Sequence, residues 1–181
     1  MVTVRRATVA DTPGMGRVHV RAWRAAYRGQ MPDEFLDGLR AEDRAAWWEA
    51  ALGRDNWSGV VLVAEQDGEV VGFAALGASP NPEGAGELFA INVDPAHWGT
   101  GAGRALLEAA QDELATLGFA ETVLWVLPGN ARARRFYERA GWASDGTEQT
   151  VDAFGVTVSE VRYRRRSSSP DSSSATPEGT E

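Results

Sequence analysis

The glycine-rich segment at residues 98–104, Trp-Gly-Thr-Gly-Ala-Gly-Arg, has the residue types of an anion-binding turn. It follows a strand-like run that ends at Val93, and a helix-like run begins near Gly103. The first N–H groups of a helix have no partner within the helix and carry partial positive charge. Glycines let an anion approach the backbone and permit positive φ. The segment therefore predicts a site for a diphosphate.

Two common phosphate-binding patterns do not fit this turn. The dinucleotide-binding pattern G-x-G-x-x-G/A, started at Gly99 or Gly101, needs a small residue where the chain has Arg104 or Leu106. The P-loop pattern G-x-x-x-x-G-K-S/T is absent from the sequence. An NAD-type oxidoreductase is therefore a poor alternative.

A second segment, residues 130–142, reads Asn-Ala-Arg-Ala-Arg-Arg-Phe-Tyr-Glu-Arg-Ala-Gly-Trp. Asn130, Ala133 and Tyr137 are spaced i, i+3 and i+7, so they share one face of a helix. Ala133 leaves room for a slender ligand, Asn130 offers hydrogen bonds to an amide-bearing arm, and Tyr137 offers a phenol that can donate a proton. The structural alternative is that Asn130 caps the helix and Tyr137 belongs to the core.

Composition limits the chemistry that the chain can use. The sequence has no cysteine and only two histidines, His19 and His97, which excludes thiol nucleophiles and thiolate metal sites; we expect no metal. The formal net charge of −8 argues against nucleic acid and is compatible with a cationic amine. No apolar run reaches the ~20 residues of a membrane helix, and the first residues do not resemble a secretory signal. We expect no membrane partner and a cytoplasmic location.

The elements that must position these segments follow from apolar periodicity and turn residues. Strands are expected at about residues 2–6, 60–65, 70–76, 87–93, 122–127, 143–151 and 154–164, and helices at about 12–27, 33–53 (broken near Arg40), 103–117 and 130–140. The crossover from residue 87 to 127 makes its two strands parallel, within otherwise antiparallel runs. The sequence predicts one α+β domain, residues 1–166, with a mixed, mostly antiparallel sheet. Residues 167–181, rich in Ser, Pro and acids, are expected to form a disordered tail.

Together the two segments resemble the GCN5-related N-acetyltransferase (GNAT) superfamily. Its first motif, Q/R-x-x-G-x-G/A after the fourth strand, is met at Gly101 and Gly103, with Trp98 in place of Gln or Arg. Its second motif, N-x-x-A-x-x-F/L-Y-x-x-x-G-F/W, is met at every specified position from Asn130 to Trp142. The order of the expected elements is also that of the family. The substitution at Trp98 leaves open what that side chain does, while backbone N–H groups can still bind phosphate.

The resemblance implies that the fourth and fifth strands splay apart and that acetyl-CoA, the acyl donor, lies between them. It implies cofactor binding by Ile91, Asn92, Val93, Gly99, Thr100, Gly101, Ala102, Gly103, Arg104, Asn130, Ala133, Arg134 and Tyr137. Tyr137 is the expected catalytic acid that protonates the leaving thiolate, and Glu87 is the candidate base, acting through water. Trp23, Tyr27 and Phe35 are expected to bind the acceptor, although an aromatic stripe can equally belong to the core.

The function implied is direct transfer of the acetyl group to a primary amine of an unidentified small-molecule or peptide acceptor. An alternative within the same fold is a non-catalytic acyl-CoA-binding module. Nucleic-acid binding through the arginines of residues 132–139 and 164–166 is a further alternative, which the net charge opposes. The identity of the acceptor and the oligomeric state, including a homodimer, stay open.

Overall fold

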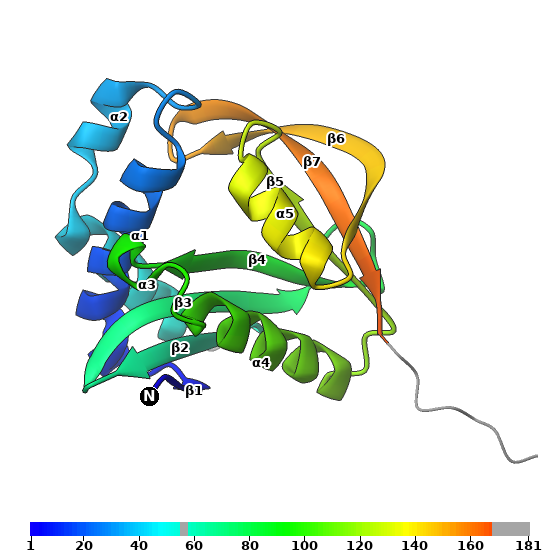
Figure 1. Ribbon diagram of the computed structural model, residues 1–181, viewed down its shortest axis with the longest axis horizontal. Helices are drawn as coiled ribbons and strands as arrows, with labels where there is room; N and C mark the ends of the chain where they lie inside the picture. Colours follow the sequence, from blue (N-terminus) through cyan, green and yellow to red (C-terminus); the bar gives the residue numbers. More distant parts are fainter. Residues whose placement is uncertain (55–57, 168–181) are drawn as a thin grey trace, which may run out of the picture.

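The computed structural model describes residues 1–54 and 58–167, which form a seven-stranded sheet with helices packed against it (Figure 1). The strands are β1 (Thr3–Arg6), β2 (Val60–Gln66), β3 (Glu69–Ala78), β4 (Gly86–Val93), β5 (Glu121–Val126), β6 (Ala143–Ala153) and β7 (Val156–Arg166). The helices are α1 (Thr12–Ala26), α2 (Asp33–Gly38), α3 (Ala41–Leu52), α4 (Ala102–Thr116) and α5 (Ala131–Arg139), with 3-10 turns η1 (Val9–Asp11) and η2 (Pro95–His97). Apart from Ser167, the predicted tail lies outside the described residues.

The strands follow the order β1-β2-β3-β4-β5-β7-β6 across the sheet. Neighbours β4 and β5 are parallel, and the other neighbouring pairs of the described sheet are antiparallel. Helix α4 makes the crossover between the parallel strands, as the sequence predicted. The helical region predicted at 33–53 is two helices, because Leu39 and Arg40 adopt extended backbone conformations between α2 and α3. The predicted α+β fold class is confirmed.

Three apolar clusters form among the described residues, and two of them pack helices α1, α3, α4 and α5 against the central strands. Helix α4 contributes its buried side chains Leu106, Leu107, Ala110 and Leu114 to one cluster, which also includes residues of α5. The other cluster joins Met15 of α1 and Trp48 of α3 to Phe73 of β3. A Cβ atom at Gly16 of α1 would lie 2.3 Å from the carbonyl oxygen of Ala41 at the start of α3. Glycine is therefore required for this close contact, which fixes α1 and the aromatic side chains it carries.

Candidate active site

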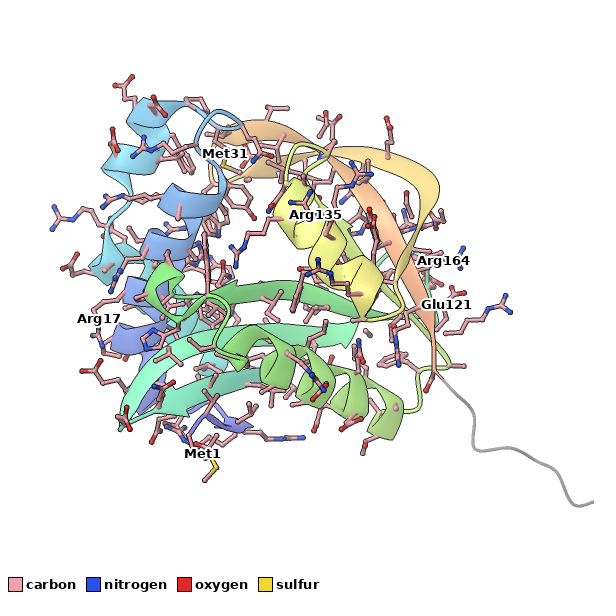
Figure 2. All side chains as sticks on the ribbon, in the orientation of Figure 1. Met1, Arg17, Met31, Glu121, Arg135 and Arg164 are labelled. Carbon is pink, nitrogen blue, oxygen red and sulfur yellow. The ribbon has the colours of Figure 1, made fainter. Side chains whose placement is uncertain are left out.

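A cleft opens where β4 and β5 stop pairing. Residues 86–88 of β4 pair with residues 122–124 of β5, and the pairing ends there although β4 continues to Val93 and β5 to Val126. The predicted splay of the two strands is therefore present. A cavity of about 740 Å³ lies here, lined by both strands, the turn before α4, helices α1, α3 and α5, and the β6–β7 hairpin. Two of its lining residues, Arg135 on α5 and Met31 before α2, are labelled in Figure 2.

A β-bulge at Phe89 sets which side chains of β4 face each side of the sheet. Consecutive residues of β3 pair with Leu88 and Ala90, so Phe89 is the extra residue. Leu88 belongs to the cluster that α4 covers, and Ile91 and Val93 pack against the same cluster. In a regular strand, Ile91 and Val93 would lie on the face opposite Leu88, because they are three and five residues away from it. They share its face because the bulge shifts the alternation of side chains by one residue.

The backbone of Ile91 and Val93 faces the gap. The N–H of Asp94 donates to the carbonyl oxygen of Val71 on β3 at 2.9 Å. Because backbone groups of alternate residues point to opposite sides of a strand, those of residues 91 and 93 point away from β3. The Val93 carbonyl accepts a hydrogen bond from the Trp98 indole Nε1 at 2.9 Å. The N–H of Val93 and both backbone groups of Ile91 can then pair with an amide-bearing ligand.

The glycine-rich turn presents the start of α4 to the cavity. Gly99 and Gly101 have φ of +78° and +99°, and a Cβ atom at either position would meet no atom within 4 Å. Backbone conformation, and not crowding, is therefore what requires glycine here. Gly101 is the N-cap of α4, and no side chain caps this helix within the described residues. Its first N–H groups are available to an external anion, and Gly99, Gly101 and Gly103 line the cavity.

Positive charge gathers at this end of the cavity. The arginines that line the cavity are Arg104, Arg132, Arg135 and Arg139. The guanidinium carbon of Arg132 lies 3.3 Å from the centre of the Trp98 ring, a cation–π contact, and burial lowers the pKa of Arg132. Trp98 therefore connects the end of β4 to α5. This is the structural role of the tryptophan that replaces Gln or Arg in the first motif.

Helix α5 places the second motif along the cavity. Asn130 is the N-cap, and its side-chain Oδ1 accepts a hydrogen bond from the N–H of Ala133 at 3.2 Å. Asn130 thus caps the helix, as the structural alternative predicted. It also lines the cavity together with Ala133 and Tyr137. Burial raises the pKa of the Tyr137 phenol above its ordinary value of 10.0, with the nearby Tyr27 adding to the rise. The Tyr137 hydroxyl therefore keeps its proton at neutral pH.

Aromatic side chains of α1 line the other end of the cavity. Trp23 and Tyr27 are lining residues, and their ring centres lie 5.2 Å apart at an interplanar angle of 87°. Burial raises the pKa of Tyr27 to about 12, and the negative charge of Glu160 on β7 adds to this rise. Phe35 packs behind Trp23, with ring centres 6.4 Å apart, and is not among the residues that line this cavity.

Glu87 is buried near the base of the splay. Its carboxylate accepts a hydrogen bond from the Ser79 hydroxyl at 2.7 Å. Burial raises the pKa of Glu87; the Ser79 hydrogen bond opposes this rise, and the charge of Glu160 adds to it. Glu160 lines the cavity, whereas Glu87 is not among the lining residues. Any contact of Glu87 with the acceptor would have to pass through water, so its role as base stays a prediction.

Three further predicted cofactor residues are not among the lining residues of the described cavity: Thr100, Ala102 and Arg134. The Thr100 hydroxyl donates to the carbonyl of His97 at 2.8 Å. Ala102 is fully buried, and Arg134 donates to the hydroxyl of Tyr163 at 2.9 Å. The N–H of Thr100 already donates to the carbonyl oxygen of His97 at 3.4 Å, so of these two residues the N–H of Ala102 is the one left for an anion, and its role in binding phosphate stays a prediction.

Sequence reasoning missed several lining residues. They are Trp47, Trp125, Arg132, Arg135, Arg139, Phe154 and Glu160. The bulky arginines of the second motif carried a usable signal, because Arg132, Arg135 and Arg139 recur every three or four residues and so share a helix face. Glu160 and Phe154 carried none, since their approach to α1 depends on strand pairing far apart in sequence.

Within residues 1–54 and 58–167, no group of three or more His, Asp and Glu side chains is arranged to hold a metal ion. Among those same residues, no helix combines the length and the apolar composition needed to cross a membrane.

Comparison with known proteins gives consistent matches. Residues 20–142 match the acetyltransferase (GNAT) family. The chain is 33% identical over 163 residues to an uncharacterized N-acetyltransferase of Bacillus subtilis, covering 89% of this chain and 91% of that one. It is 32% identical over 150 residues to mycothiol acetyltransferase of Saccharopolyspora erythraea, covering 80% of this chain but 45% of that enzyme. The PaiA N-acetyltransferase of Thermoplasma acidophilum, solved in complex with coenzyme A, has the same fold, with a TM-score of 0.77 at 20% identity over 92% of this chain and 99% of that one.

Proposed function

Since the chain belongs to the acetyltransferase (GNAT) family, we propose that it transfers the acetyl group of acetyl-CoA directly to a primary amine. The observation that carries the proposal is the splayed gap between β4 and β5, with an uncapped helix start at one end and the Tyr137 side chain along it. The bound coenzyme A of the Thermoplasma acidophilum structure, which shares the fold, supports the choice of donor.

The groups around the gap fit acetyl-CoA. The first N–H groups of α4, together with Arg104 and Arg132, suit the diphosphate. The backbone of Ile91 and Val93 suits the amides of the pantetheine arm, and the small side chain of Ala133 leaves space for it. When bound, acetyl-CoA supplies a thioester whose acetyl group can pass to nitrogen.

Glu160 and Glu87 are the candidate bases that remove a proton from the acceptor. An alkylammonium has a pKa near ~10.4 in water, so the nitrogen must lose a proton before its electron pair can form the new C–N bond. Glu160 lines the cavity, and Glu87 lies near enough for the charge of Glu160 to raise its pKa. Glu160 can take the proton directly, and Glu87 can take it through water. His19 is not suited to this role, because burial, with the charge of Arg44, lowers its pKa from 6.5 to about 3.

Tyr137 is the proposed acid of the last step. As the C–S bond breaks, its electron pair goes to sulfur, and the Tyr137 hydroxyl donates a proton there. The nitrogen, which is positively charged once the C–N bond has formed, releases its extra proton to solvent and leaves a neutral amide. The raised pKa of this phenol ensures that the proton is present at neutral pH. Exchange with solvent then restores the hydroxyl, so no covalent link to the protein is needed.

Two measurements test the proposal separately. Calorimetry with acetyl-CoA is expected to show binding, and its absence at millimolar ligand would refute the assigned donor. Thiol release from acetyl-CoA is expected to depend on an added primary amine. Tight donor binding without amine-dependent release would instead favour a non-catalytic acyl-CoA-binding module.

A further inference from the structure

The hairpin between β6 and β7 places an aromatic side chain where its turn disfavours one. Ala153 pairs with Val156, so Phe154 and Gly155 form a two-residue turn, and both have positive φ, +56° and +90°. Hairpin turns of this kind favour Asn-Gly or Gly-Gly, because a large side chain at positive φ is strained. A residue of the wrong type persists where its contacts outweigh that strain, which is common at ligand sites.

The contacts of Phe154 join the hairpin to two helices. Its ring centre lies 5.6 Å from Trp23 and 5.9 Å from His19 on α1, and 5.8 Å from Trp47 on α3. The guanidinium of Arg44 lies 4.1 Å from the same ring centre. Figure 1 shows the hairpin reaching across toward α1 and α2. Phe154 therefore forms part of an aromatic wall built from three separate elements.

Part of this wall stays exposed to the cavity. Phe154 is 38% exposed and Trp47 is 44% exposed, and both line the cavity together with Trp23. The other lining residues at this end are mainly apolar and include Ala22, Ala26, Met31, Ala153 and Val158. His19 is uncharged because its pKa is about 3. Arg44 already lies over the Phe154 ring; the aromatic surface that stays exposed favours a flat apolar group, and it also attracts a cation.

One carboxylate lines the same cavity as this wall. Glu160 is the acidic residue among those that line the described cavity. Its Oε2 accepts a hydrogen bond from the Gln149 amide at 2.9 Å, and no arginine of the described residues forms an ion pair with it. A partly buried carboxylate without a cationic neighbour favours a cation supplied by the ligand.

We propose that the acceptor is an aromatic alkylamine, whose ammonium group pairs with Glu160 and whose ring stacks against Trp23, Trp47 and Phe154. The inference rests on the proposed acetyl transfer and adds to it the chemical class of the acceptor. Glu160 lies six residues beyond Phe154 along the hairpin, so the proposal places the ring toward the hairpin tip and the charged nitrogen further along β7.

Binding can be measured without catalysis by ligand-observed NMR titration with three probes of similar size. They are 2-phenylethylamine, its saturated counterpart 2-cyclohexylethylamine, and the uncharged 2-phenylethanol. The native protein is expected to bind 2-phenylethylamine about fivefold more tightly than the saturated amine, because of ring stacking. We expect a preference of about tenfold over the alcohol, because of the charge-assisted contact.

Two variants separate the two recognition elements. Phe154→Asn removes the ring at a position whose positive φ suits asparagine, so folding is preserved while the preference for phenyl over cyclohexyl disappears. Glu160→Gln should abolish the preference for the amine over the alcohol. Glu148→Gln, on the exposed part of β6, is the matched control and should change neither ratio.

Kinetics with the same two amines distinguish failure of this inference from failure of the proposed function. Thiol release that is faster with 2-phenylethylamine supports the inference. Equal or faster release with 2-cyclohexylethylamine, or equal binding of all three probes, would overturn the aromatic-amine assignment while leaving acetyl transfer intact. Loss of acetyl-CoA binding itself would instead overturn the proposed function.

Discussion

Replacing Tyr137 by phenylalanine should separate catalysis from stability. The aromatic ring stays, so its packing against Trp142 and Tyr163, with ring centres 6.4 and 6.5 Å away, is preserved. Burial and the nearby Tyr27 are the causes of the raised pKa of the Tyr137 phenol, and no hydrogen bond contributes to it. Loss of the hydroxyl therefore removes no internal hydrogen bond, and Tm should change by less than about 2 °C. Loss of a general acid should lower kcat about 10²–10³-fold, or about 3–4 kcal/mol in the barrier.

Tyr163→Phe is the matched control for this prediction. The Tyr163 hydroxyl accepts a hydrogen bond from Arg134 at 2.9 Å and donates one to Glu138 at 2.8 Å. Its loss should cost about 1 kcal/mol of stability, lowering Tm by about 2–4 °C, while kcat is retained. Stopped-flow or steady-state thiol release gives kcat, calorimetry gives acetyl-CoA affinity, and thermal unfolding gives Tm. A kcat for Tyr137→Phe within threefold of the native value would refute its role as the acid.

Three further substitutions test other parts of the molecule. Gly101→Ala forces a side chain into positive φ at a cost of about 1–2 kcal/mol and should weaken acetyl-CoA binding in calorimetry. The control is Gly38→Ala, at an exposed site with ordinary φ and open space, which should leave acetyl-CoA binding unchanged. Trp98→Phe removes one indole hydrogen bond, so urea unfolding should show a loss of about 1 kcal/mol; an unchanged midpoint would contradict the observed bond. Arg5 holds the pKa of Asp11 at about 2, below its ordinary 3.8. This stabilisation is present above pH ~4 and is lost as the pH falls toward 2, so Asp11→Asn should cost about 2 kcal/mol at pH 7 and flatten the dependence of stability on pH in that range.

The parts of the site that depend on local sequence could be predicted. Positive φ at Gly101 and the helix that follows it are local properties of the turn. The same holds for α5, because Asn130 caps the helix and the spacing of Ala133 and Tyr137 places both on one face. The parallel pairing of β4 and β5 could be predicted from the order of elements alone, because a helix that connects two adjacent strands lets them run in the same direction.

The acceptor end of the cavity could not be predicted, because it depends on contacts between distant segments. Glu160 reaches the cavity through the register of β7 with β5 and β6, and no local pattern fixes that register. Phe154 gives no turn signal, since Phe is unusual at positive φ. The bulge at Phe89 is equally silent in the sequence, yet it decides which face Ile91 and Val93 occupy. The Arg132–Trp98 contact joins two segments that the motifs describe separately.

Under the proposed function, the distribution of charge along the cavity explains how one acidic chain would bind two unlike substrates. The protein carries a formal net charge of −8, which would repel a polyanionic donor at long range. Arginines of α4 and α5 reverse that sign at the start of α4, where the donor's phosphates would lie, while Glu160 keeps the opposite end negative. An anionic donor and a cationic acceptor are then each attracted to a different end, and only their uncharged or neutralised reacting groups need to meet near Tyr137. High salt should consequently raise the KM for the donor and for a charged amine together, while leaving the KM for an uncharged acceptor unchanged.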